Sequence, residues 1–132
     1  MLVIIYTILI SYMFFFTTCI APVINVSLNK QNASKLLRRI FPKNFKFGLA
    51  VSVIAILISI FEKNLTSFFL SLVLFIFFLI NLYYVMPKIN DIADEDKKKN
   101  TYSKKFKKLH FLSVSVYLLQ MILSILGIII CY

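Results

Sequence analysis

The stretch FLSVSVYLLQMILSILGIIIC, residues 111–131, contains no Asp, Glu, Lys or Arg and is long enough to cross a lipid bilayer as one helix. Thirteen of its residues are Leu, Ile, Val or Phe, and each favours insertion by about 0.3 to 0.6 kcal/mol at the centre of a helix. Together they contribute about 4 to 8 kcal/mol, which outweighs the cost of the few Ser residues and the Gln. The stretch therefore predicts a transmembrane helix.

Three further stretches have the same character, at residues 2–20, 47–61 and 67–86. A spanning helix needs about 20 residues, so the stretch 47–61 is short, and we expect Phe45 to extend it while Lys46 reaches the headgroups. The chain has 132 residues, of which 61% are hydrophobic, which is too much apolar surface for so small a core to bury. We predict an all-α membrane protein, a single antiparallel four-helix transmembrane bundle over residues 1–132.

The basic residues predict which way the bundle sits in the membrane. Of the 15 Lys and Arg residues, 14 lie in two of the gaps between the apolar stretches, at residues 21–46 and 87–110. By the positive-inside rule both gaps face the cytoplasm and both termini lie outside. Residues 1–20 contain no Lys or Arg, unlike the start of a secretory signal peptide, so we expect a retained helix in a multi-pass cell (inner) membrane protein.

A net charge of +10 would suit nucleic acid, but here the charges border membrane helices. Contact with anionic lipid headgroups on the cytoplasmic face explains them better, and we expect no nucleic-acid partner. The residues that we expect to meet headgroups are Arg38, Arg39, Lys104, Lys105, Lys107 and Lys108.

Between the first two spans the chain has an amphipathic repeat. Ala33, Leu36, Leu37, Ile40 and Phe41 follow the spacing of one helix face, and Pro42 is expected to end that helix. Two arrangements fit this pattern. We predict a short interfacial helix lying along the membrane surface, and the alternative is an extension of the membrane helix into the cytoplasm.

Small and weakly polar residues recur at helical spacing within the spans. In membranes such faces bring helices together through close approach and hydrogen bonds, so we expect them to face the bundle interior, with Tyr117 and Gln120 among them. The predicted faces are Thr7, Ser11, Phe14, Thr18 and Ala21; Gly48, Ser52, Ala55 and Ser59; Asn81, Tyr84 and Lys88; and His110, Ser113, Tyr117, Gln120, Ser124, Gly127 and Cys131.

Several motifs occur together in an order that resembles a known family. They are Ala21-Pro22, the pattern Leu37-x-x-Ile-Phe-Pro42-x-x-Phe45-x-x-Gly48, the run N-L-Y-Y-V-M-P at residues 81–87, and Phe106-x-x-Leu-His110-x-x-Ser113. This order is similar to that of the small four-pass family related to eukaryotic transmembrane protein 205, a member of which is linked to cisplatin resistance. The resemblance implies a four-helix membrane fold and no established reaction. Its motif residues here are Asn81, Tyr84, Pro87, His110, Ser113, Tyr117 and Gln120.

The candidate chemistry lies at the cytoplasmic ends of the helices. His110 is the only His, and its imidazole suits a metal, haem or proton role, but a His at the start of a helix that hydrogen-bonds a neighbouring helix is the simpler explanation. Cys19 and Met86 are expected at a similar depth, so the three side chains would suit a soft metal ion. Asn81 must find a partner inside the bundle, with His110, Tyr84 or a Ser as the choices.

Enzymatic roles are poorly supported by the sequence. The spans contain no acid to accompany the single His, so a nucleophile with a base and an orienting group is missing, and we expect no enzyme and no required cofactor. We expect a structural bundle that interacts with another membrane protein or with itself. The alternative is a protein that binds or moves haem, a soft metal ion or a metal drug at the cytoplasmic end.

Overall fold

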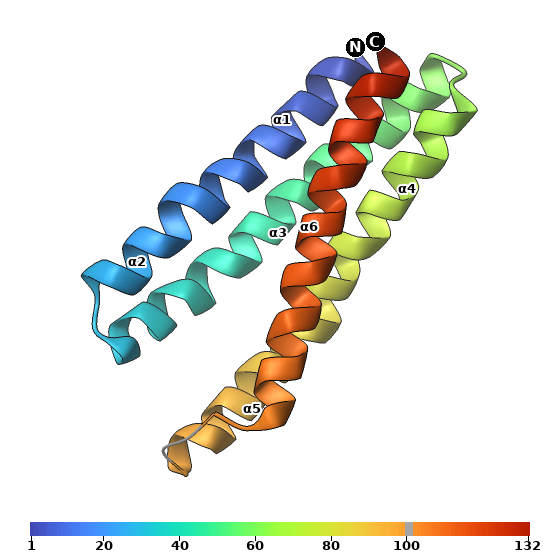
Figure 1. The fold of residues 1–132 in the computed structure, drawn as a ribbon. Helices are drawn as coiled ribbons and strands as arrows, with labels where there is room; N and C mark the ends of the chain where they lie inside the picture. Colours follow the sequence, from blue (N-terminus) through green and yellow to red (C-terminus); the bar gives the residue numbers. More distant parts are fainter. Residues whose placement is uncertain (100–101) are drawn as a thin grey trace.

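The computed structural model describes residues 1–99 and 102–132. It contains four helical segments that are long and apolar enough to cross a membrane, at Leu2–Ser27, Lys30–Phe61, Leu65–Lys98 and Lys104–Cys131. They pack side by side as a four-helix bundle (Figure 1), which confirms the predicted fold class. All four are longer than the apolar stretches predicted, because each continues as helix into more polar sequence.

Two of the four segments contain a short π-helical turn. The first consists of α1 (Leu2–Phe15), η1 (Phe16–Ile20) and α2 (Ala21–Ser27), and the third of α4 (Leu65–Ile80), η2 (Asn81–Val85) and α5 (Met86–Lys98). Each π turn comes just before a proline at the start of the next helix, and a π turn is one way for a helix to continue past a disruption. The other two segments are α3 (Lys30–Phe61) and α6 (Lys104–Cys131).

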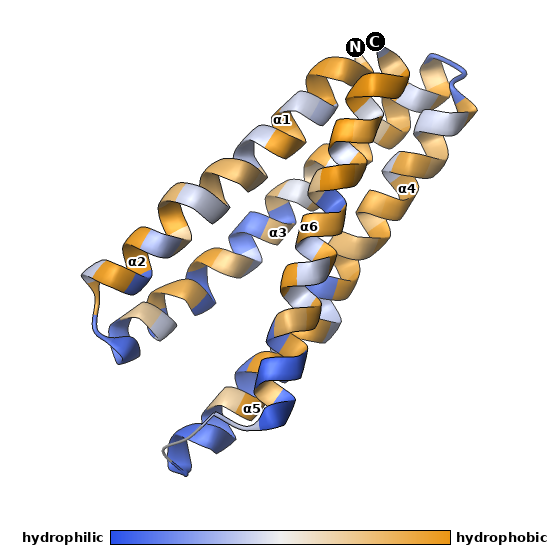
Figure 2. Ribbon diagram, viewed as in Figure 1, coloured by the Kyte–Doolittle hydropathy of each residue, from blue (hydrophilic) through white to orange (hydrophobic). Residues whose placement is uncertain are grey.

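The helices alternate in direction, and the first packs beside the last as well as beside α3. Both termini lie at one end, next to the α3–α4 turn (Figure 1), and we call this the terminal end. The α2–α3 and α5–α6 connections lie at the opposite end, which we call the basic end because it carries most of the Lys and Arg residues. Figure 2 shows apolar residues along most of each helix and hydrophilic ones concentrated at the basic end.

Side chains that accept hydrogen bonds from free backbone amides fix where three of the helices begin. Asn29 accepts from the Asn32 amide at 2.8 Å, Asn64 from the Ser67 amide at 3.0 Å, and Ser103 from the Phe106 amide at 3.3 Å. Such caps satisfy amides that have no partner within the helix. The connections are therefore short, and consecutive segments pack as antiparallel neighbours.

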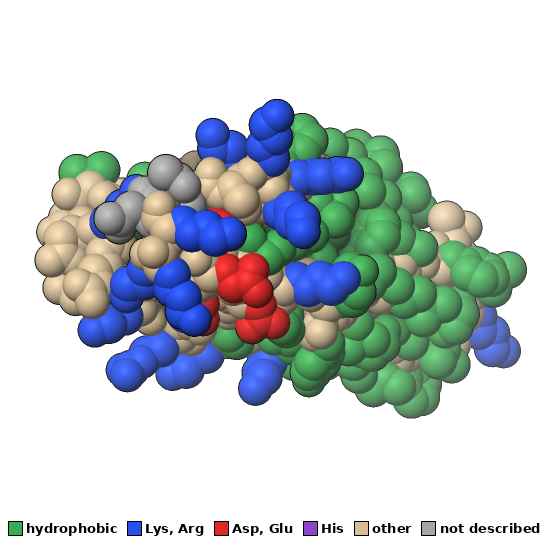
Figure 3. Space-filling model, turned by 90° about the horizontal axis from the view of Figure 1, so that it is seen from below, with side chains coloured by type: hydrophobic (Ala, Val, Ile, Leu, Met, Phe, Trp, Pro, Cys, Tyr) green, Lys and Arg blue, Asp and Glu red, His purple; other side chains and the backbone are tan. Residues whose placement is uncertain are grey.

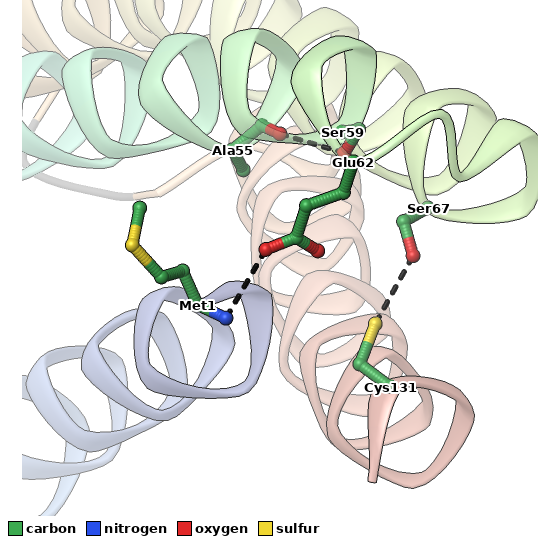
Figure 4. Close-up of polar contacts among 6 residues, drawn as sticks. All are labelled: Met1, Ala55, Ser59, Glu62, Ser67 and Cys131. Carbon is green, nitrogen blue, oxygen red and sulfur yellow. Dashed lines mark hydrogen bonds and ion pairs between the residues drawn. The ribbon is translucent and has the colours of Figure 1, made fainter.

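The terminal half of the bundle is tightly packed around Tyr6. Its hydroxyl contacts the Ser71 hydroxyl at 2.8 Å and donates to the Ser67 carbonyl at 3.1 Å, while its ring lies against Gly127. Figure 4 shows the outermost layer, where the Met1 amino group pairs with Glu62 and the Cys131 thiol meets the Ser67 hydroxyl at 3.0 Å. Groups from the first and the last segment thus meet the α3–α4 hairpin at this end.

The small and polar faces predicted on α3 and α6 are largely buried. Gly48, Ser52, Ala55 and Ser59 are all buried, and so are Gln120, Ser124 and Gly127. Of the three residues predicted for the face of the third segment, Asn81 is buried, whereas Tyr84 and Lys88 are exposed.

The face predicted for the first segment is wrong. Thr7, Ser11, Phe14 and Thr18 are exposed, and Leu2, Tyr6, Leu9, Met13 and Phe16 are buried instead. The exposed hydroxyls are satisfied locally, since Thr7 and Thr18 donate to the carbonyls four residues earlier, at 2.7 and 2.8 Å, and the larger Leu, Tyr, Met and Phe side chains fill the interior instead. A hydroxyl that is satisfied within its own helix needs no partner across the bundle.

The predicted interfacial helix between the first two spans is not a separate element. Residues 33–41 belong to α3, which continues without a break through Pro42 to Phe61. The extension of a membrane helix, the alternative arrangement, is the one found, since the apolar side of this repeat packs on neighbouring helices. Phe41, for example, lies edge-on to Phe16 with ring centroids 5.3 Å apart. Pro87 likewise does not end its helix, which runs on through the acidic stretch to Lys98.

Candidate functional site: a cavity at the basic end

Toward the basic end the bundle opens. The hairpin formed by α2 and the start of α3 diverges from the hairpin formed by α5 and the start of α6 (Figure 1). Between them lies a cavity of about 630 Å³. All four segments contribute to its wall, so the cavity is a property of the bundle and not of one helix.

The deep part of the cavity is apolar and largely aromatic. Phe16, Phe41 and Phe45 form one side, Met86 and Ile89 another, and Val114 and Leu118 of α6 a third. Leu118 is 49% exposed, so the wall on this side is thin and lies at the surface that lipid would cover. The mouth is polar instead, with Asn25, Lys30, Arg38, Asn90 and Tyr102.

Polar side chains from all four segments gather where the cavity meets the packed half of the bundle. Asn44 of α3 donates to the Tyr117 hydroxyl of α6 at 3.1 Å, and Ser113 of α6 donates to the Asn81 side-chain oxygen at 3.3 Å. Tyr12 of α1 lies edge-on to Phe47, with ring centroids 4.8 Å apart. Ser113 and Tyr117 also line the cavity, so its deep end is closed by this polar layer.

Some atoms of the buried polar side chains have no protein partner among the described residues. They are the Tyr12 hydroxyl, the Asn81 side-chain nitrogen and both polar atoms of the Gln120 amide. Asn81 and Gln120 are fully buried. An unpaired polar group costs free energy in a membrane interior, so the centre of the bundle keeps hydrogen-bonding capacity that its own packing does not use.

The three residues proposed to bind a soft metal ion do not all line the same cavity in the structure. His110 and Met86 both line the cavity, but Cys19 is exposed in η1 and does not. Within residues 1–99 and 102–132 no group of three or more His, Cys, Asp and Glu residues is arranged to hold a metal. The His110 ring is exposed and stacks parallel on Phe106, with centroids 6.0 Å apart.

The motif residues of the third segment also lie in different environments. Asn81 is buried and meets Ser113 of α6, one of the partners expected for it, while Tyr84 points away from the core and receives a 2.7 Å hydrogen bond from Lys88. Pro87 lies at the start of α5, just after the π turn. The run at residues 81–87 thus supplies one interior polar contact and a change in helical geometry.

The basic residues form a ring around the end of the bundle. Figure 3 shows Lys and Arg side chains spread around a smaller acidic group at this end. Arg39, Lys104, Lys105, Lys107 and Lys108 are exposed, as residues that contact headgroups would be. Arg38 differs, because its guanidinium turns inward, donates to Asp94 at 2.7 Å and lines the cavity mouth.

Sequence reasoning missed several residues of this site. Asn44 could have been found, because it lies four residues before Gly48 and continues the predicted face of α3 by one turn. The aromatic residues Phe16, Phe41 and Phe45 carried no such signal, since Phe occurs in every span. Their gathering around a cavity depends on how far the two hairpins diverge, which no local pattern reports.

Comparison with known proteins assigns the chain to a family. No curated protein and no solved structure matches the chain. A family described as a domain of unknown function, DUF4149, matches residues 4–98, a region that includes nearly all of the first three helical segments and the cavity residues from Phe16 to Ala93. Because this match covers well over half of the chain, the protein belongs to the DUF4149 family.

Proposed function

We propose that this protein binds a small molecule with an apolar body in the cavity at the basic end of the bundle. The cavity itself carries the proposal. Its volume of about 630 Å³ lies within the range of about 300 to 1,000 Å³ that is typical of small-molecule sites. Such sites combine apolar and aromatic walls with a few polar groups, and the Phe16, Phe41 and Phe45 wall with the Ser113 and Tyr117 floor has this composition.

The position of the cavity favours a ligand that arrives from the membrane. Leu118 and Val114 line it and are also 49% and 43% exposed, so this part of its wall lies at the surface that lipid would cover. The polar mouth, with Lys30 and Arg38, lies at the end where the chain becomes hydrophilic. We therefore propose a ligand that enters from the lipid and keeps its polar part at the membrane surface.

We further propose that the basic end faces the cytoplasm and the termini lie outside, in a bacterial inner membrane. The distribution of Lys and Arg supports this orientation, and the exposed ring of Arg39 and Lys104 to Lys108 is placed to meet anionic headgroups. On the motif at residues 81–87 we also propose kinship with eukaryotic transmembrane protein 205. We propose a role in binding or transport rather than catalysis, because the apolar stretches 2–20, 47–61, 67–86 and 111–131 contain no Asp or Glu to accompany His110.

Photo-cross-linking tests the proposal. The full chain in lipid nanodiscs would be treated with a long-chain fatty acid that carries a diazirine near the middle of its chain, and labelled peptides would be mapped by mass spectrometry. Leu118→Trp fills the cavity, while Leu119→Trp is the control, since Leu119 is similarly exposed but does not line it. We expect saturable labelling of cavity residues that is lost in Leu118→Trp and kept in Leu119→Trp.

Labelling spread evenly over the lipid-facing helices, with equal effects of the two Trp variants, would overturn the proposal. The structural role, in which the bundle serves only to contact itself or another membrane protein, would then be favoured. In both variants the folded fraction would be compared by thermal unfolding, so that loss of labelling is not mistaken for loss of fold.

A second candidate, haem or a soft metal ion as the ligand, is favoured by one observation. His110 and Met86 come from different helices and line the same cavity, and imidazole with thioether is a donor pair that suits such groups. Visible absorption and metal content of the purified protein, beside His110→Ala and Met86→Leu, test this candidate. Stoichiometric haem or metal that is lost in both variants would support it, and a colourless, metal-free protein would exclude it.

A further inference from the structure

A second cavity adjoins the first at the basic end. Its volume is about 400 Å³, and it shares Lys30, Ser34, Arg38, Ala93 and Tyr102 with the apolar cavity. The two therefore lie side by side, the first as an apolar inner part and the second as a polar outer part. The additional lining of the outer part includes Lys35, Lys97, Asp94 and Asp96, so cations outnumber acids there.

The two acids of the outer part already have partners. Asp96 is buried and accepts from both the amide and the hydroxyl of Ser103, at 2.8 and 2.9 Å, which holds the α5–α6 connection together. Asp94 accepts from Arg38 at 2.7 Å, and this hydrogen bond holds the pKa of the Asp94 carboxyl below its usual range. Because both carboxylates are engaged in these contacts, the remaining cations that line the outer part are Lys30, Lys35 and Lys97.

The contact between Arg38 and Asp94 crosses the mouth from α3 to α5. The same guanidinium nitrogen also donates to the Asn90 carbonyl at 3.4 Å, so Arg38 is held over the opening where the two cavities join. Asp94 is weakly fixed by comparison, since its side chain is 59% exposed against 33% for Arg38. An exposed ion pair of this kind contributes little to stability and is easily exchanged.

We propose that the ligand is a single-chain amphiphile with a carboxylate head, and that this carboxylate replaces Asp94 as the partner of Arg38. The inference rests on the proposed function and specifies the ligand of the same cavity. Asp94 shows that a carboxylate reaches Arg38 at this position, and a guanidinium binds carboxylates through paired, charge-assisted hydrogen bonds. The apolar chain then extends between Phe41 and Leu118 toward the Ser113 and Tyr117 floor.

The polar surroundings of Arg38 fit this head group. The Lys30 ammonium lies 4.6 Å from the centre of the Tyr102 ring, so a second cation is held beside the opening. Burial of a carboxylate requires such compensation, whereas a neutral head group would leave the cations of the mouth unused. An amphiphile in this position would be oriented like a lipid of the leaflet at the basic end, with its head at the surface.

The experiment compares two ligands of equal chain length, a long-chain fatty acid and the corresponding long-chain alcohol. Equilibrium binding of each is measured to the full chain in nanodiscs of zwitterionic lipid, for the unaltered protein and for Arg38→Gln, Asp94→Asn and Arg39→Gln. Arg39 is the matched control, because it neighbours Arg38 but is exposed and lines neither cavity.

We expect the fatty acid to bind more tightly than the alcohol. Arg38→Gln should weaken fatty-acid binding about tenfold or more, as loss of a charge-assisted hydrogen bond implies, and leave alcohol binding unchanged. Asp94→Asn should strengthen fatty-acid binding, because the competing carboxylate is gone. Arg39→Gln should change neither.

Different failures have different meanings. If fatty acid and alcohol bind equally and Arg38→Gln changes neither, the carboxylate inference is overturned while the cavity remains a binding site. The same inference is overturned if Arg39→Gln weakens fatty-acid binding as much as Arg38→Gln, since surface charge alone would then explain the effect. If neither ligand binds the unaltered protein, the proposed function itself fails.

Discussion

The contacts of Tyr6 show how a single polar side chain can hold helices together where lipid removes most of the hydrophobic driving force. Its hydroxyl is buried and reaches two groups of α4, the Ser71 hydroxyl and the Ser67 carbonyl. Within a membrane such hydrogen bonds contribute about 0.6 kcal/mol on average and up to about 2 kcal/mol. This contact ties α1 to α4, two helices separated by α3 in the chain.

We predict that Tyr6→Phe lowers the free energy of unfolding by about 1 kcal/mol, because it removes both contacts and leaves the Ser71 hydroxyl with fewer partners. Unfolding by a denaturing detergent in mixed micelles measures the change. Tyr83→Phe is the control, since Tyr83 is 67% exposed, and it should have no effect. Equal free energies of unfolding for the two variants would show that the hydrogen bonds of the Tyr6 hydroxyl do not stabilise the packing of α1 against α4.

Gln120 should respond differently from Tyr6. It is fully buried, but neither its amide nitrogen nor its amide oxygen has a protein partner among the described residues. Gln120→Leu has a similar size and removes two unpaired polar atoms, so we predict unchanged or slightly increased stability in the same unfolding assay. A loss of more than about 1 kcal/mol would mean that the amide has a partner, such as a bound water or ligand.

At the level of the helix, the start of α3 is the element that sequence reasoning described least well. The repeat at residues 33–41 and the proline that follows both suggested a helix lying in the membrane surface. In the structure Phe41 and Phe45 stack, with ring centroids 6.0 Å apart, and continue the buried side of α3 past Pro42. Tertiary packing thus supports a helix through a residue that disfavours it locally.

We predict that this continuous helix remains in lipid. Spin labels at Lys35, Arg39 and Lys43, all exposed, should report a steady change in depth, because a straight helix rises about 1.5 Å per residue. Depth is measured from the relative access of oxygen and a water-soluble nickel complex to each label. Equal depth at the three positions would indicate a helix lying along the interface and would contradict the structure.

Which face of a helix turns inward was predictable only in part. On α3 and α6 the small residues mark the interior, because helices approach closely where Gly and Ser allow it. A Cβ added at Gly127 would lie 2.7 Å from the Tyr6 ring, so the residue must be small there. On α1 the interior face is made of Leu, Met and Tyr, and the Thr hydroxyls are satisfied within the helix, so composition alone points to the wrong side.

For the whole molecule, the fold class and the four spans follow from the sequence because lipid imposes a simple rule. Long uncharged stretches must be helical, and short connections make neighbours antiparallel. The site does not follow from the sequence in the same way. His110 and Met86 share a cavity that Cys19 does not line, and Arg38 turns toward Asp94, because of where two hairpins diverge. That divergence depends on packing over the whole bundle.

If the cavity at the basic end holds a small amphiphile, that molecule should remain bound when the protein leaves the membrane. Native mass spectrometry of the protein, released from nanodiscs made with its own membrane lipids, measures this. We predict one small carboxylate-containing molecule bound per chain, retained in Leu119→Trp and absent from Leu118→Trp. A bare chain in every sample, or adducts that are the same in both Trp variants, would contradict this prediction.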